Sequence, residues 1–323
     1  MANAPSGRQD ISAQAQLARA PAEAATKRAH RTRIPLWPYL FALPYAILLI
    51  VFAVAPAAYG IVLSVLSNGD SGTHFVFLQN YREAVSFFAF SSALVHVLEY
   101  LGVWLPTLIV MVLFLSLLLH MRPGRFPTAA KVIYYLPGAL TGSPSALLWV
   151  FLLTPVLSPY GPLMHLVGFN QAPDILESGY HHLPFVFALQ AFFTGAGGWI
   201  LVFYGALEGL SPEILEAAAI DGCSAIQQAV LIKLPLMSKY VYYMVILSVA
   251  SGMQLFVEPQ LFNSASAVYA SNVWSLNQVA LRFAFEFAKF SVAASIAVIL
   301  LIFGIIAAFI IIRYTDFYST DFS

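Results

Sequence analysis

The chain has 323 residues, of which 60% are apolar and only 9% are charged, and its formal net charge is zero. Soluble domains carry about 25% charged residues, so this composition excludes an ordinary globule with a charged exterior. Zero net charge provides no global field to attract nucleic acid, and the single cysteine, Cys223, excludes an intramolecular disulfide. We therefore expect an all-α polytopic membrane protein that contacts lipid and does not bind nucleic acid.

The first 35 residues differ from the rest of the chain. They are rich in Ala, Gln and Arg and contain no apolar run, so they are not a secretory signal peptide. The basic cluster from Lys27 to Arg33 precedes Trp37 and Tyr39, an order typical of a first span that enters from the cytoplasm. We predict that residues 1–35 form a disordered basic cytoplasmic tail, and a nucleic-acid role for this tail is the less favoured alternative.

Six stretches are long and apolar enough to cross a hydrocarbon core of about 30 Å, which takes roughly 20 residues. Prolines within these stretches are tolerated because neighbouring helices can satisfy the carbonyls that they free. The six predicted spans are Tyr39–Leu66, Val97–Leu119, Val132–Leu153, Leu183–Leu207, Tyr240–Val257 and Ser291–Ile312.

The basic residues predict the orientation of these spans. With the N-terminus inside, cytoplasmic segments hold twelve Lys and Arg residues and external loops hold three, Arg82, Arg282 and Lys289. This excess favours six spans with both termini in the cytoplasm. The membrane domain then covers residues 36–318, and residues 319–323 form a short C-terminal tail.

The cytoplasmic segment 208–239, between spans four and five, is too structured for a simple connection. Ser211 suits a helix N-cap and Pro212 the first helical position, and Glu213 is well placed against the helix dipole. This first helix should end at Gly222, because glycine tolerates the left-handed conformation of a helix C-terminus. Ser224 then caps a second helix, whose length Pro235 limits.

Together these signals predict a helix–glycine–helix elbow at the cytoplasmic surface. Ile226, Val230 and Leu234 fall on one face of its second arm. An amphipathic helix in this position lies more often on lipid or on its own bundle. The first arm is acidic, however, whereas helices that bind lipid surfaces favour Lys and Arg, and this favours docking with another protein.

The residues of this elbow also match a known pattern. The run Glu216-Ala217-Ala218, Asp221-Gly222, Ile232 and Leu234-Pro235 resembles the EAA loop of binding-protein-dependent ABC importer permeases. Tyr135-Leu136-Pro137 followed by Trp149 resembles the third-span signature of the carbohydrate branch, the maltose and glycerol-phosphate type. Phe256-Val257-Glu258-Pro259 resembles the end of its fifth span. The resemblance extends from about residue 36 to Tyr318.

The resemblance implies a type I ABC importer permease fold in the bacterial cytoplasmic (inner) membrane. It implies a non-catalytic subunit for a sugar or sugar derivative, which works with cytoplasmic ATPase subunits, a second homologous permease and an extracytoplasmic substrate-binding protein. The chain contains no Gly-Lys-Ser/Thr motif, so ATP and Mg are expected on the partner ATPase, and no cofactor or metal is expected on this chain. The implied ATPase-coupling residues are Glu213, Glu216, Ala217, Ala218, Asp221, Gly222, Leu234 and Pro235.

The chain departs from the family pattern in several places. Ile226 and Ala229 stand in the second arm where Trp and Phe are usual, and Lys239 stands where proline is common. Asn263-Ser264-Ala265-Ser266 replaces Thr-x-Gly-Gly-Pro, and His96-Val97 replaces an Asn-Thr pair. These departures predict altered docking in the second arm and an altered external gate.

Ionisable residues within spans are costly and therefore mark candidate functional sites. Glu99 lies in span two with His96 one turn before it, and the two side chains could instead pair with each other. Glu258 lies at the outer end of span five, and aromatic faces nearby could stack on sugars. The candidate substrate-pathway residues are His96, Glu99, Tyr100, Trp104, Trp199, Gln254 and Glu258.

Two other classes of polytopic membrane protein are alternatives to a permease. An ion-coupled secondary transporter would favour more buried charges and internal repeats, and a polytopic membrane enzyme would need a catalytic constellation that the sequence does not present. The doublet His181-His182 in an external loop is expected at the membrane interface and not as a metal site.

Overall fold

The computed structural model describes residues 36–69, 72–121, 124, 126–166, 168, 183–265 and 273–315. The predicted tails, 1–35 and 319–323, and the doublet His181-His182 lie outside the described residues. Contacts divide the chain into two units, residues 1–58 and 59–323. The described part of the first unit contains α2 (Leu36–Leu49), the π-helix η1 (Ile50–Val54) and the start of α3 (Ala55–Ser64).

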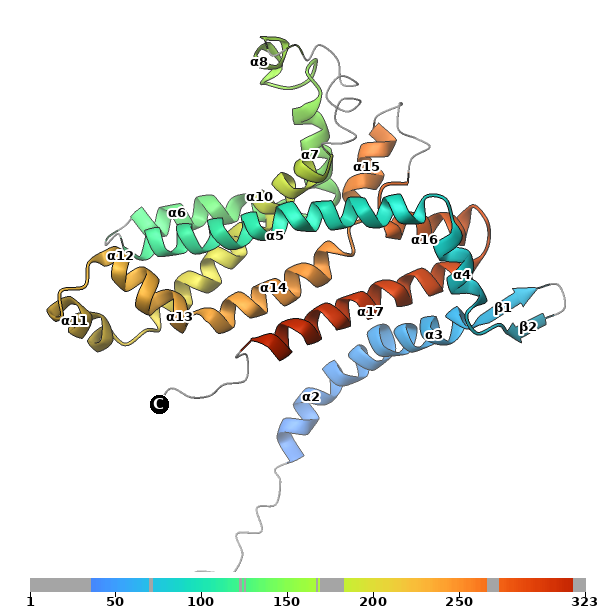
Figure 1. Cartoon of the computed structure of the whole chain (residues 1–323), viewed down its shortest axis with the longest axis horizontal. Coiled ribbons are helices and arrows are strands. Elements are labelled where there is room, and N and C mark those ends of the chain that lie inside the picture. The colour runs from blue at the N-terminus through green and yellow to red at the C-terminus, as the bar shows by residue number, and fades with distance from the viewer. Residues whose placement is uncertain are drawn as a thin grey trace, which may run out of the picture. The chain divides into compact units, whose positions relative to one another are not determined.

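The second unit is a helical bundle with one small hairpin (Figure 1). The hairpin pairs β1 (Leu66–Gly69) with β2 (Gly72–Phe75) in antiparallel register. The main helices of this unit are α4 (Gln79–Ser86), α5 (Phe90–His120), α6 (Phe126–Tyr135), α7 (Ser143–Leu153), α8 (Gly161–Leu166), α10 (Leu183–Glu208), α14 (Ser238–Gly252), α15 (Val257–Ala265), α16 (Leu276–Phe285) and α17 (Phe290–Tyr314).

Five helices in the described residues are long and apolar enough to span a membrane, or six if one bent pair counts as a span. The first, fourth and sixth match the predicted spans to within two residues at each end. The second begins at Phe90 and not at Val97, the third begins at Phe126 and not at Val132, and the fifth ends at Ser264 and not at Val257. No proline or glycine lies between Phe90 and Val97, so nothing prevents the second helix from starting earlier. His96 and Glu99 therefore lie within the helix and not at its start.

The third predicted span, Val132–Leu153, is broken. The segments Phe126–Ala139 and Ser143–Leu153 meet at an angle of 95°. Pro137 lies in a short 3₁₀ turn, Leu136–Ala139, and Gly142 has a φ of +67°, which favours glycine. The sequence prediction of a continuous span did not give these two residues enough weight as helix breakers.

The fifth span is interrupted as well. The stretch Ser238–Ser264 qualifies as a span, but its helix stops at Gly252 and resumes at Val257. The four residues between the two helices are a turn followed by two residues without regular secondary structure. Non-helical backbone at membrane depth is tolerated only where it is buried in protein or lines a cavity.

The core of the second unit lies where α5, α10, α14 and α17 run beside one another (Figure 1). Its most deeply buried side chains include Leu108, Ile200, Phe203, Met244 and Ile296. The helix α4, the hairpin and α16 lie at one end of this bundle, and the segment between α10 and α14 lies at the other. The two ends of the bundle therefore present different loops for recognition.

One glycine allows a close helix contact that a side chain would prevent. A Cβ at Gly197 in α10 would collide with the carbonyl oxygen of Tyr134 and lie 2.8 Å from the Cα of Tyr135. The neighbouring Gly198 has nothing within 4 Å of the same position. Gly197 therefore holds the broken third span against α10, consistent with the small residues that membrane helix contacts require.

We expect Gly197→Ala to lower stability by about 1–3 kcal/mol, because backbone atoms must move to admit the methyl group. Gly198→Ala is the matched control and should be neutral or slightly stabilising, because alanine is the better helix former. Thermal unfolding of the two variants in the same detergent tests this difference. Equal melting temperatures would contradict the close contact.

Candidate functional site

The elbow predicted at 208–239 is present, and its first arm is α11 (Pro212–Ile220). Ser211 occupies the N-cap position and Pro212 begins the helix as expected, although the Ser211 hydroxyl makes no capping hydrogen bond. Of the arm's residues only Ala218 is buried, while Glu213, Glu216 and Ala217 are exposed. The arm therefore presents nearly its whole surface outward.

Gly222 ends this arm in the predicted left-handed conformation, with a φ of +83°. The amide of Cys223 donates to the carbonyl of Ala218 at 2.9 Å, and the amide of Gly222 donates to that of Ala219 at 3.1 Å. This pair of hydrogen bonds is the Schellman motif, which needs a residue with positive φ at the position of Gly222. The exposed Asp221 directly precedes this turn.

The second arm begins as predicted and then deviates. Ser224 and Gln227 form a reciprocal capping box at the start of α12 (Ala225–Gln228). A π-helical turn, η3 (Ala229–Lys233), follows and leads into α13 (Leu234–Leu236), which contains Pro235.

The predicted apolar face of this arm does not face the bundle. Ile226 is 69% exposed and Val230 is 52% exposed. The buried positions are instead Ala229, Lys233 and Met237. They share the same four-residue spacing, and Ala229 brings only a small side chain to the buried face. The two departures from the family pattern are therefore linked: Ala229 turns inward and Ile226 turns outward.

Lys233 is a functional candidate that the sequence analysis missed. Only 5% of this residue is exposed, and its Nζ lies 3.0 Å from Nδ1 of His120 at the end of α5. The His120 ring meets Tyr204 of α10 edge-on, and the Nζ of Lys131 in α6 lies 3.8 Å from the Tyr204 ring centre. This cluster joins the second arm of the elbow to α5, α6 and α10.

Burial lowers the pKa of the Lys233 ammonium below its usual range. The signal in the sequence was a lysine between Ile232 and Leu234, at the same four-residue spacing as Ala229 and Met237. A charged residue on an otherwise apolar stripe is costly to bury unless it finds a partner. Its partner, His120, is 113 positions away in the chain, so no local pattern could reveal it.

A pocket of about 320 Å³ lies at the break in span five. The interrupted segment lines it from Ser251 to Glu258, together with residues of α5 and α10. Glu258 lies in the first turn of α15. Discontinuous membrane helices commonly form the substrate sites of transporters, because their freed backbone groups and helix ends are available to a ligand.

The pocket brings together four of the seven predicted pathway residues: Tyr100, Trp104, Gln254 and Glu258. The rings of Tyr100 and Trp104 stack at 5.4 Å with 17° between their planes. Trp104 is only 7% exposed, and its indole Nε1 has no hydrogen-bond partner among the described residues. A buried donor without a partner is costly, so this group is a candidate for contact with a ligand acceptor.

The other three predicted residues do not line this pocket. His96 stacks on Trp274 at 5.4 Å, and its Nδ1 lies 3.3 Å from the Trp274 carbonyl oxygen. Trp199 meets Tyr243 edge-on. Glu99 is exposed on the surface of α5, an unusual position for a carboxylate within a span.

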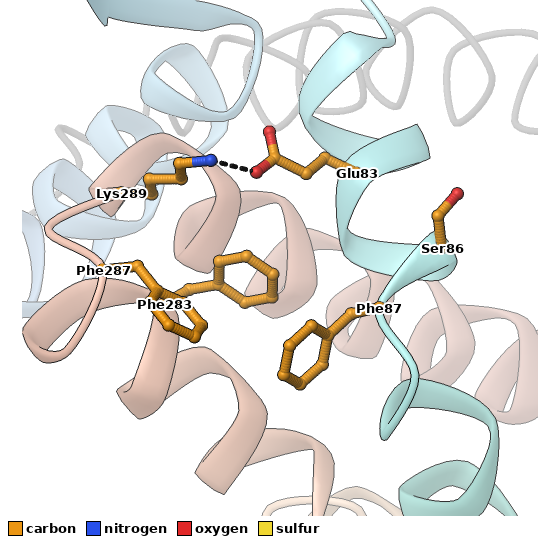
Figure 2. A pocket seen from close by; sticks show the side chains of 6 residues that line it. All are labelled: Glu83, Ser86, Phe87, Phe283, Phe287 and Lys289. Carbon is orange, nitrogen blue, oxygen red and sulfur yellow. Dashed lines mark hydrogen bonds and ion pairs between the residues drawn. The ribbon is translucent and has the colours of Figure 1, made fainter.

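A larger hollow, about 530 Å³, lies at the other end of the bundle from the elbow, between α4 and the turn from α16 to α17. Figure 2 shows Phe87, Phe283 and Phe287 gathered on one side and the ion pair of Lys289 with Glu83 above them. Its charged groups satisfy each other and its remaining wall is mainly aromatic. We favour the smaller pocket as the ligand site because it has an unpartnered buried donor and lies at a helix break.

Comparison with known proteins shows what the chain resembles. No family model matches the chain. The chain is 25% identical over 288 residues to the arabinooligosaccharides transport system permease protein AraP of Bacillus subtilis (strain 168), covering 88% of this chain and 90% of AraP. Its relatives are permease subunits of ABC transporters. Like them, the chain is a permease subunit and not an enzyme, because the ATPase of such a transporter is a separate chain. It is a multi-pass protein of the inner membrane.

Two further likenesses agree with this family. The sn-glycerol-3-phosphate transport system permease protein UgpA of Pectobacterium atrosepticum is 25% identical to the permease over 219 residues, 65% of this chain and 71% of UgpA. A chain in the crystal structure of a bacterial alginate ABC transporter, in complex with an alginate pentasaccharide-bound periplasmic protein, superposes with a TM-score of 0.72. That match covers 89% of the permease and 96% of the other chain at 15% identity, and it confirms the predicted fold.

The buried lysine gives the permease a predictable response to pH. Because the pKa of Lys233 is lower in the fold than in the unfolded chain, the unfolded state holds more protons between the two pKa values. Stability contributed by this group therefore rises with pH across that window, up to the unfolded pKa of about 10.4. Lys233→Met removes this contribution.

We expect the melting temperature of the unmodified permease to rise relative to that of Lys233→Met as the pH is raised from about 7 to about 10. Paired thermal unfolding curves in one detergent at each pH measure this difference. A difference that stays constant or moves the other way would contradict the burial of a charged Lys233.

Proposed function

We propose that the permease is a subunit of an ATP-driven importer for a sugar or sugar derivative, and that it couples closure of the ATPase subunits to alternating access. The observation that carries the proposal is the exposed arm α11, held out by the Schellman turn at Gly222. The arm has an 87% exposed Ile220 beside the carboxylates of Glu216 and Asp221. An exposed large apolar side chain with charged neighbours suits the groove of a partner protein.

The implied coupling residues fit this role by position. Glu213, Glu216, Ala217 and Asp221 are exposed on the arm and its end, and Ala218 forms the base where the Schellman hydrogen bond closes. Leu234 and Pro235 lie in α13, the turn of helix that leads to span five. Any force on the arm reaches that span through this short connection.

Lys233 gives the elbow a second connection to the bundle. Its hydrogen bond to His120 ties the second arm to α5, and His120 in turn contacts Tyr204 of α10. We propose that this cluster carries movement of the docked arm into α5 and α10, which together form walls of the pocket. A buried polar contact suits this role because it has few alternative arrangements.

The proposed substrate class rests on the pocket and on the names of the relatives. AraP is an arabinooligosaccharide permease and UgpA a glycerol-3-phosphate permease. In this chain the pocket offers aromatic side chains, the free indole donor of Trp104 and the side chains of Gln254 and Glu258. Aromatic faces with a few neutral donors and acceptors suit the hydroxyl groups of a carbohydrate.

The proposed assembly also contains a second permease, cytoplasmic ATPase subunits that bind ATP and Mg, and an extracytoplasmic substrate-binding protein. Glu99 supports the second permease, because an exposed carboxylate on a span should face a water-filled cavity or a partner and not lipid. The similar alginate transporter forms a complex with a periplasmic protein that carries an alginate pentasaccharide, which supports a binding protein as partner. In this arrangement both termini and the elbow are cytoplasmic.

Replacement of Gly222 tests the coupling role. We expect Gly222→Val to abolish most ATP-driven uptake while membrane insertion remains, because a β-branched residue does not adopt the positive φ of the Schellman turn. Gly222→Asn is the matched control, since asparagine tolerates this conformation and should retain most uptake. Uptake and ATPase activity are measured together in proteoliposomes. Full uptake by Gly222→Val would count strongly against the docking role.

Charge reversal at Glu216 tests the partner. The permease should co-purify with an ATPase subunit in mild detergent, and Glu216→Lys should reduce the amount recovered several-fold because it reverses a charge on the exposed arm. Glu286→Lys, at the opposite end of the bundle, is the control and should leave recovery unchanged. Substrate uptake by the permease alone in liposomes under an ion gradient would instead establish a secondary transporter.

A further inference from the structure

The described lining of the pocket at the break in span five contains an acidic side chain but no basic one. Among the described residues that line it, Glu258 is the one ionisable carboxylate, and none is Lys, Arg or His. Its other polar groups are neutral: the indole of Trp104, the amide of Gln254 and the hydroxyls of Ser251 and Thr194. An anionic ligand would therefore meet a carboxylate and find no cation among the described residues of the site.

The hydroxyl groups of the pocket are turned into acceptors by their own hydrogen bonds. Ser251 donates to the carbonyl of Ser248 at 3.1 Å, and Thr194 donates to that of Gln190 at 3.0 Å. Their oxygen lone pairs remain available, as do the oxygens of Glu258 and Gln254. A site rich in acceptors suits a ligand that brings donors, which means sugar hydroxyls or an ammonium group.

Two basic side chains near the outer hollow do not supply positive charge to the pocket. Lys289 is paired with Glu83 beside the outer hollow (Figure 2), and Arg282 is paired with Glu286 one helical turn away. Each of these basic side chains is therefore neutralised by a neighbouring carboxylate. Glu99 adds a further acidic group on α5.

We infer that the pocket binds a neutral or amino sugar and rejects anionic carbohydrate. This inference rests on the proposed function and narrows its substrate class. The permease would then differ in substrate charge from the UgpA permease and the alginate transporter that it resembles, since glycerol-3-phosphate and alginate are both anions. An ionised carboxylate repels an anion at close range, whereas an ammonium group at the same place forms a charge-assisted hydrogen bond.

The test uses the complete transporter complex, purified in mild detergent without its binding protein, so that selectivity reports on the permease. The probes are three trisaccharides of equal length and different charge: chitotriose (cationic), tri-N-acetylchitotriose (neutral) and trigalacturonate (anionic). Binding is measured by isothermal titration calorimetry at about pH 6, where the amines of chitotriose are protonated and trigalacturonate is ionised. We expect trigalacturonate to bind at least about tenfold more weakly than the other two.

Glu258→Gln identifies the source of the discrimination. The substitution keeps the size of the side chain and removes its charge, so the ratio between the affinities for chitotriose and trigalacturonate should fall several-fold. Glu286→Gln removes the same charge at an exposed position outside the pocket and should leave that ratio unchanged. Size-exclusion chromatography of each variant shows that the complex is intact.

Three results would overturn the inference. Trigalacturonate could bind as tightly as the neutral trisaccharide, the ratio could be unaffected by Glu258→Gln, or none of the three probes could bind at millimolar concentration. All three leave the proposed coupling function standing, because that function is judged by co-purification of the ATPase and by the Gly222 variants. Failure of those experiments would contradict the importer itself.

Discussion

The need to satisfy every backbone polar group in lipid governs the structure of this permease. Continuous helices meet it within each span, so a span can be interrupted only where protein or a cavity surrounds the freed groups. The described chain has two such interruptions, at Leu136–Gly142 and at Met253–Phe256. The second lines the pocket, where it frees backbone groups and places Glu258 in the first turn of a new helix.

A second constraint acts at the elbow end of the bundle, where the chain leaves the spans. There the first arm is held away from the bundle by backbone hydrogen bonds around Gly222, while the second arm is held against it by Ala229, Lys233 and Met237. One arm is therefore free to meet a partner, and the other is committed to the bundle. This division suits a segment that receives a force and transmits it, and the hydrogen bond of Lys233 with His120 is its most specific contact.

The two ends of the bundle use charge differently. At the end opposite the elbow, Lys289 with Glu83 and Arg282 with Glu286 form ion pairs at the surface. These pairs contribute little to stability but leave little net charge beside the hollow. At the elbow end the exposed arm keeps its carboxylates unshielded by the bundle. The pocket between the ends has one carboxylate and neutral donors and acceptors. This distribution is consistent with a neutral ligand and a partner with a basic groove.

Local signals in the sequence were enough to predict the membrane class, the position of the spans, the elbow with its turn at Gly222 and the family, because hydrophobic length, helix caps and positive-φ glycines act within a few turns of the chain. The sequence also identified Tyr100, Trp104, Gln254 and Glu258 as candidates. That these four share one pocket, while Glu99 and Trp199 do not line it, became visible only in the folded molecule. The same holds for the buried face of the second arm and for the contact of Lys233 with His120. Such contacts join residues far apart in the chain, so they depend on how the helices pack and leave no local pattern.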